Sequence, residues 1–324
     1  MQLFENACSC YALLVAFALS ACEGGTQPAN ALGSAGASGA AGDGGLESSL
    51  ASDSAQWPMP NSPGLGLPNP ASYDSEATPG VVRDQVTGLD WLQDPGSELY
   101  SRADAISRCD ELSFAGYDDW RVPAFIELVS LFDVTPNDRD PLAPSYIAPA
   151  FQARGRFWSS TPVTKAGFGR LLDFEADGCS ASQVCSIGVA GDAEQALGGA
   201  FCVRNSEPPA TSTRYQRNDD IVTDLRTGLS WQGVPATIQT VDHADGVSAC
   251  AALGNGARLP SITELLSILV PVLDNEAFPG WPPAAFAWSS SAIAENPGTF
   301  WAGAIAGATR AEPSGNHNRV QCVR

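Results

Sequence analysis

The chain has 324 residues, of which 44% are hydrophobic and 16% charged, so it is long enough to form two domains with packed cores. Its formal net charge is −19, and Lys165 is the single lysine. Binding to nucleic acid or to an anionic membrane surface depends on basic stripes, so this charge argues against both modes of binding and makes sulfated polysaccharides poor candidate partners.

The N-terminal segment predicts export. Residues 11–21, YALLVAFALSA, form an apolar run that matches the core of a signal peptide and is too short to cross a bilayer. The run ends in Leu-Ser-Ala-Cys, the pattern of a bacterial lipobox, which predicts removal of residues 1–21, lipidation of Cys22 and anchoring in the bacterial envelope. An ordinary signal peptide is the alternative. No basic residue precedes the run and Glu5 is acidic, a departure that a wrongly assigned start codon would explain.

Composition then divides the rest of the chain. Residues 22–56 are rich in Gly, Ala and Ser and predict a flexible tether, because they carry too little apolar surface to offset the entropy of ordering. Residues 57–79 are a Pro-rich lead-in, and residues 205–219 read as a linker. Two domains are therefore expected, at 80–204 and 220–324.

The two expected domains are copies of one unit. The blocks VRDQVTGLDW, WRVPAFIELVSL and FWSST of the first copy match VTDLRTGLSW, ARLPSITELLSI and AWSSS of the second, in the same order. Cys109 matches Cys250 between these blocks, and Cys-Val-Arg closes both copies, at 202–204 and 322–324.

Each copy is expected to be α+β, with two helices and a loop-rich antiparallel sheet of short strands. Ser101 and Asp104 have the spacing of a capping box at the start of the first helix, and Pro123 suits the start of the second. The apolar positions predicted to face the core are Ala103, Ile106, Cys109, Leu112, Phe125, Leu128, Val129 and Phe132 in the first copy, and Ala244, Val247, Cys250, Leu253, Ile262, Leu265, Leu266 and Leu269 in the second.

The cysteines predict disulfides. Of nine, two leave with the signal peptide and Cys22 takes the lipid, and an even number in an exported chain favours pairing. The second copy holds Cys250 and Cys322 alone, so a self-contained domain requires that pair. The repeat then predicts Cys109 with Cys202, which leaves Cys179 with Cys185. Metal binding is the alternative, but the chain has no C-x-x-C spacing.

The repeated blocks resemble the bacterial Lcl C-terminal domain family, whose pattern is D-x-x-T-G-L-x-W, D-W-R-L-P-x-x-x-E-L, W-S-S-T and a final C-V-R. The first copy matches with Asp119-Trp120-Arg121-Val122-Pro123, whereas the second has Gly256-Ala257 in place of Asp-Trp and ends its block in WSSS. The resemblance implies a C-type-lectin-like fold, in which a disulfide joins a helix to the last strand, and a surface adhesion role. Sulfated-glycan binding by the founding member does not carry over, because both domains are acidic.

Site candidates follow from residue type. Arg121 with Glu127 and Arg258 with Glu264 are predicted structural ion pairs, and Trp91, Trp158, Trp231 and Trp288 are predicted core residues. Trp281 and Trp301 lie outside the repeated blocks. Packing in the core or at its rim is the favoured interpretation of both, and stacking on a sugar is the alternative. Asn137, Asp138 and Asp140 are candidate calcium ligands in a loop whose other interpretation is a solvated surface.

No catalytic set is evident. His243 and His317 are the two histidines, and neither lies in a metal-binding or hydrolase motif. The sequence therefore favours a non-catalytic binding or adhesion protein of the cell surface or periplasm, with a glycan or an envelope protein as partner and with no cofactor besides the calcium alternative. A structural envelope protein without a small ligand, or an enzyme on a lectin-like fold, are the other interpretations.

Overall fold

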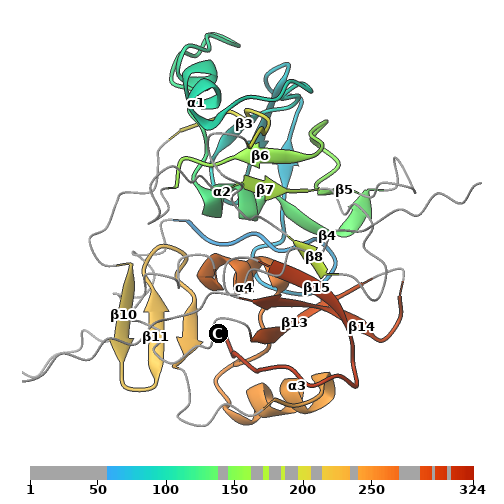
Figure 1. Ribbon diagram of the computed structural model, residues 1–324. Coiled ribbons are helices and arrows are strands. Elements are labelled where there is room, and N and C mark those ends of the chain that lie inside the picture. Colours follow the sequence, from blue (N-terminus) through green and yellow to red (C-terminus); the bar gives the residue numbers. More distant parts are fainter. Residues whose placement is uncertain are drawn as a thin grey trace, which may run out of the picture. The chain divides into compact units, whose positions relative to one another are not determined.

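The computed structural model describes residues 57–137, 145–161, 171–174, 184–186, 196–205, 214–233, 240–269, 285–293, 296–304 and 308–324. The predicted signal peptide, Cys22 and the predicted tether lie outside these residues. Among the described helices, none has both the length and the apolar character needed to cross a bilayer. The fold mixes helices with small antiparallel sheets and contains two tandem copies of one unit, so the α+β prediction is confirmed (Figure 1).

Each copy opens on an antiparallel meander. In the first copy, strands β1 (Tyr73–Asp74), β2 (Val81–Asp84), β3 (Asp90–Leu92) and β9 (Val203–Arg204) form one sheet in that order. In the second copy, β10 (Tyr215–Asn218), β11 (Ile221–Asp224) and β12 (Ser230–Gln232) form the equivalent sheet. The closing Cys-Val-Arg adds to both sheets, because Val203 pairs with Trp91 and Val323 pairs with Trp231.

Capped helices follow the meanders. Helix α1 (Arg102–Asp110) begins after Ser101, whose side chain accepts from the Asp104 amide, as its sequence spacing predicts. Helix α3 (His243–Ala252) is capped by Asp242 in the same way. The apolar stripes predicted for these helices are partly wrong: α3 buries His243, Gly246 and Cys250, whereas Val247 and Leu253 are exposed. Helix α3 turns the face with His243, Gly246 and Cys250 toward the sheet, and the missing side chain of Gly246 leaves room for Trp288.

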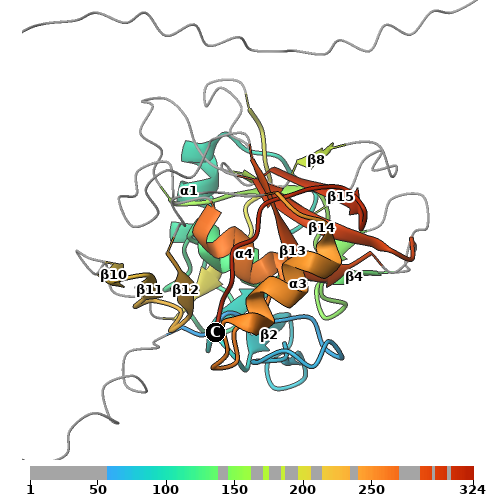
Figure 2. The same ribbon diagram turned by 90° about the horizontal axis from the view of Figure 1, so that it is seen from below.

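The main sheet of the second copy has a core on each face. It consists of β13 (Phe286–Ala292), β14 (Thr299–Ala304), β15 (Ala308–Pro313) and, from the first copy, β8 (Val184–Ser186). The cross-strand pair Trp288 and Ala302 faces α3 and the disulfide, whereas the neighbouring pair Ala287 and Gly303 faces α4 (Ile262–Leu269). Figures 1 and 2 show α3 and α4 on opposite sides of this sheet.

The corresponding part of the first copy is described by shorter elements. These are helix α2 (Phe125–Ser130) and strands β4 (Phe132–Asn137), β5 (Ser145–Ile147), β6 (Arg156–Trp158) and β7 (Leu171–Asp173). β4 pairs with β5 and β6 with β7, both antiparallel. The pair Trp158 and Leu171 occupies the register that Trp288 and Ala302 occupy in the second copy.

Helices α2 and α4 are buried on all sides. Every residue of α4 is buried, including Thr263, Glu264 and Ser267, and the same holds for α2. Sequence periodicity predicts one apolar face for each helix, but α2 and α4 contact one another across the two copies and each also packs on a sheet. The copies therefore share one continuous apolar core, which includes Trp57 of the lead-in, residues of α2 and α4, and Trp301.

Candidate functional site

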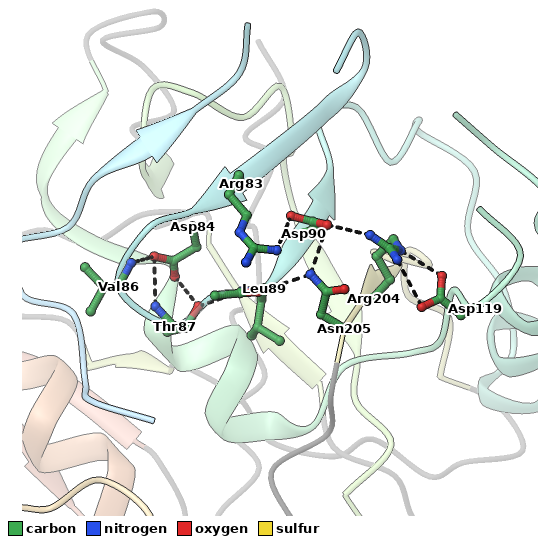
Figure 3. A network of polar contacts seen from close by, with 10 residues as sticks. Arg83, Asp84, Val86, Thr87, Leu89, Asp90, Asp119, Arg204 and Asn205 are labelled. Carbon is green, nitrogen blue, oxygen red and sulfur yellow. Dashed lines mark hydrogen bonds and ion pairs between the residues drawn. The ribbon is translucent and has the colours of Figure 1, made fainter. Parts of the chain in front are cut away.

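The Asp-x-x-Thr-Gly-Leu motif builds a tight turn between β2 and β3. The buried carboxylate of Asp84 accepts from the backbone amides of Val86 and Thr87, at 2.9 and 3.3 Å, and from the Thr87 hydroxyl at 2.6 Å (Figure 3). Gly88 has a φ of 75°, which a residue with a Cβ rarely adopts. The motif thus forms the turn itself, and its polar groups are occupied within it.

Arg204 connects the closing Cys-Val-Arg to the start of the first copy. Its Nη1 donates to Asp90 at 2.6 Å and its Nε to Asp119 at 2.7 Å (Figure 3). Its guanidinium carbon also lies 3.6 Å from the ring centre of Tyr117. The hydrogen bond from Arg204 lowers the pKa of Asp119. Arg83 donates to the other oxygen of Asp90 at 2.9 Å, so the charges alternate in sign along the network.

This network belongs to the first copy alone among the described residues. Thr223, Ser230 and Gly256 stand where the first copy has Arg83, Asp90 and Asp119. The second copy joins the same strands through its backbone, because Ser230 and Arg324 exchange two hydrogen bonds of 2.9 and 3.0 Å. The two copies share a fold but differ in surface chemistry.

The Arg–Glu pairs of the second helices are present in both copies. Arg121 grips the buried carboxylate of Glu127 through two hydrogen bonds of 2.7 and 2.8 Å. Arg258 grips Glu264 in the same way, with both distances at 2.7 Å. Each glutamate also accepts from the backbone amide at the start of its helix, so the pair fixes the helix start onto the strand before it. These contacts are structural and leave no free carboxylate for chemistry.

Two of the three predicted disulfides lie within the described residues. Cys109 in α1 bonds to Cys202, and Cys250 in α3 bonds to Cys322, as the repeat predicts. Both tie the first helix of a copy to its closing strand segment. The third predicted pair, Cys179 with Cys185, lies outside the residues whose side chains the structure describes.

The repeated tryptophans are core residues: Trp91, Trp158, Trp231 and Trp288 are all completely buried. The indole N–H of Trp158 donates to the Tyr100 carbonyl, and that of Trp288 to the Val241 carbonyl, both at 2.8 Å just before the first helix of each copy. The interpretation of Trp301 as a sugar-stacking residue is wrong for this structure, because its side chain is only 2% exposed and packs edge-on against Phe132 and Tyr146 of the first copy. Trp281 lies outside the described residues.

Histidine and metal candidates give no site within the described residues. His243 is buried, its ring stacks on Phe300, and its Nε2 lies 3.0 Å from the Ser289 carbonyl oxygen; burial lowers its pKa. The part of the chain that the structure describes contains no group of three His, Cys, Asp or Glu side chains that could hold a metal ion. The candidate calcium ligands Asp138 and Asp140 lie outside it, as does the side chain of Asn137.

An open cavity of about 380 Å³ lies beside the Cys109–Cys202 disulfide. Leu92, Ala200 and Cys202 contribute its buried part. Its exposed part comes from the loop after β3 and from α1, and the residues are Asp94, Pro95, Gly96, Ser97, Glu98, Tyr100 and Arg108. The Tyr100 hydroxyl donates to Glu98, which raises the pKa of Tyr100, and it also interacts with Arg108.

Comparison with known families explains the repeat. The Lcl C-terminal domain family matches residues 80–183 and 220–324, which together span more than half of the chain. The chain belongs to the Lcl C-terminal domain family. The resemblance carried by the repeated blocks is thus confirmed in both copies. No curated protein matches the chain.

In the described part of the chain, motif residues of both Lcl C-terminal domains make turns, ion pairs, disulfides and core contacts. The sequence places Asp119 and Arg204 in family motifs but predicted no contact for either. It predicted no role for Arg214 or for the loop at residues 94–98 that lines the cavity. The sequence feature that pointed to Arg204 was its place in the closing Cys-Val-Arg triplet, whose cysteine forms a disulfide. The loop at residues 94–98 carried no motif, so the cavity became visible through tertiary structure alone.

Proposed function

We propose that this chain is an exported, lipid-anchored envelope protein whose two Lcl C-terminal domains, of C-type-lectin-like fold with two helices each, serve non-catalytic binding or adhesion. The lipobox at Cys22 and the Gly/Ala/Ser tether support the anchoring, because together they would hold a disulfide-stapled body away from a membrane. A glycan or an envelope protein is the partner class, with no requirement for a cofactor.

The observation that carries the proposal is the open cavity of the first domain. Concave surfaces with an apolar floor and a few polar groups are the usual form of ligand sites. Here the floor consists of Leu92, Ala200 and the disulfide-bonded Cys202, and the polar groups come from one loop and one helix. The charged groups around it form no nucleophile–base pair within the described residues, which favours binding over turnover.

A structural envelope role without a small ligand is the second candidate. The observation that favours it is that many of the described family-motif residues are used in turns, ion pairs, disulfides and core packing. Such a protein would act as a folded body that is anchored to the membrane and contacts neighbouring envelope proteins.

Two experiments test the proposal. Residues 23–324, exported behind an ordinary cleavable signal peptide, are applied to a glycan array with and without calcium, and the native protein is cross-linked in cells. Binding to a defined glycan class supports the lectin interpretation, whereas silence on every glycan beside a reproducible cross-linked envelope protein would reject it in favour of a protein partner. Silence in both favours the structural role. Mass spectrometry of the membrane fraction tests the anchor, which is rejected if the mature N-terminus is not a lipidated Cys22.

A further inference from the structure

The cavity of the first Lcl C-terminal domain combines an apolar floor with an acidic rim. Its floor consists of the residues Leu92, Ala200 and Cys202, which are all buried. Its rim carries the carboxylates of Asp94 and Glu98 and one guanidinium, that of Arg108. The rim therefore has one more negative than positive charge, in a chain of net charge −19. This field repels anions and attracts cations.

Each rim carboxylate keeps one oxygen available. Asp94 uses its Oδ1 to accept from the Gly96 amide at 2.8 Å, and Glu98 uses its Oε2 to accept from the Tyr100 hydroxyl. Arg108 interacts with the same hydroxyl, so the cation on the rim already has a partner. Among the hydrogen bonds of the described residues, none uses the second oxygen of either acid.

Apolar surface continues beyond the cavity mouth. Leu99 is 56% exposed and Leu197 is 45% exposed. They precede Tyr100 and Gly198 in the chain, which pair through two backbone hydrogen bonds of 2.9 and 3.0 Å, and Tyr100 lines the cavity. A ligand with a carbon skeleton gains contact with this surface, because removing apolar area from water is favourable.

We propose that this cavity binds a small organic cation, a primary ammonium group attached to a compact apolar or ring-shaped body. The ammonium would lie between the free carboxylate oxygens of Asp94 and Glu98, and the body would lie against Leu92, Ala200 and the disulfide. This inference rests on the proposed binding function and names the chemistry of one ligand class for it. It assigns no such site to the second domain.

The test uses three probes with the same ring and different charge: cyclohexylammonium, cyclohexanol and cyclohexanecarboxylate. Calorimetric titration of the purified native protein at low ionic strength is expected to detect cyclohexylammonium, weaker binding of cyclohexanol, and no binding of the carboxylate. Added salt should weaken the first of these, since the carboxylates are exposed.

Variants locate the binding. Glu98→Gln and Asp94→Asn are each expected to weaken cyclohexylammonium roughly two- to five-fold, as loss of one exposed ion pair does. Arg108→Gln is expected to strengthen it by a similar factor, because it removes a repelling charge. Glu76→Gln is the matched control: it removes one exposed acid outside the cavity and should leave binding unchanged. A thermal unfolding curve for each variant confirms that the domain is folded.

Three results would overturn the inference: equal binding of all three probes, no binding of any, or the same loss in Glu76→Gln as in Glu98→Gln. Its failure is distinguishable from failure of the proposed function. A positive glycan array or cross-link with no cyclohexylammonium binding rejects the cavity alone. Cyclohexylammonium binding that follows the variants as stated supports the cavity even where array and cross-link are silent.

Discussion

The guanidinium of Arg214 closes on the buried carboxylate of Asp224, with Nε 3.0 Å and Nη2 2.6 Å from its two oxygens. The Nη2 of Arg214 also donates to the Ser267 carbonyl at the end of α4, at 3.0 Å. In the first domain the register of β1 and β2 aligns Tyr73 with Asp84 as Tyr215 aligns with Asp224, so Ser72 stands where the second domain has Arg214. Asp84 is equally buried, and turn hydrogen bonds replace the cation.

This difference predicts a pH dependence of stability. Burial raises the pKa of Asp84 above its ordinary value of 3.8, because desolvation disfavours the carboxylate. Between the ordinary pKa and the raised one, the folded state binds more protons than the unfolded state. The contribution of Asp84 to stability is therefore greatest below the ordinary pKa and falls as the pH rises through the raised one.

Urea unfolding from pH 4 to pH 7 measures this contribution. Asp84→Asn removes the titrating carboxyl group. The free energy of unfolding of this variant, measured relative to that of the native protein, should therefore increase as the pH rises. Asp224→Asn is the matched control. It leaves the guanidinium of Arg214 buried without its carboxylate and should destabilise the protein at pH 7 by about 3 kcal/mol. Parallel pH curves for the native protein and Asp84→Asn would contradict the assignment.

The bidentate pair of Arg258 and Glu264 predicts a large effect of truncation. Glu264 is 1% exposed, so Arg258→Met leaves a buried carboxylate without its cation and should lower the free energy of unfolding by about 3–5 kcal/mol. Arg83→Met, at an ion pair whose arginine is 42% exposed, should cost less than about 1 kcal/mol. Chemical unfolding of both variants measures the two losses of unfolding free energy. Equal losses in Arg258→Met and Arg83→Met would show that burial of the carboxylate does not determine how much stability is lost.

The disulfide of the second domain predicts a loss of similar size. Cys250 and Cys322 are separated by 72 residues, and closing a loop of that length stabilises the folded state by about 4 kcal/mol in the chain-entropy account. The double variant Cys250→Ala with Cys322→Ala should show this loss in urea unfolding, with the Cys109→Ala and Cys202→Ala pair as its counterpart in the first domain. Free thiols at Cys250 or Cys322 in mass spectra of the native protein would refute the pairing.

Trp301 couples the two domains. It belongs to β14 of the second domain, and its ring centre lies 5.3 Å from that of Tyr146 in the first. We expect one cooperative unfolding transition for both domains, and Trp301→Ala should destabilise the protein by about 3–5 kcal/mol. Far-ultraviolet circular dichroism and tryptophan fluorescence should give the same midpoint in the native protein. Two resolved transitions there would contradict a shared core.

Local chemistry made part of this fold readable from the sequence. Ser101 caps α1 because a side-chain oxygen can satisfy an amide three residues on, whatever lies around it. The repeat fixed the partners of Cys109 and Cys250, since a copy with two cysteines has one internal pairing. The two Arg–Glu ion pairs were likewise predictable, because a strand followed directly by a helix brings residues six apart into contact.

Tertiary structure decided what depends on contacts between distant segments. The sequence by itself determined the two units, their α+β class, their family and their long-range disulfides, because these follow from repetition and local hydrogen bonding. It did not determine that α2 and α4 are buried on every side, that Trp301 lies in a core shared by both domains, or that the loop after β3 and α1 line an open cavity. Those features arise where two copies meet or where a loop lies over a disulfide, and one-dimensional periodicity holds no information about which surfaces come together.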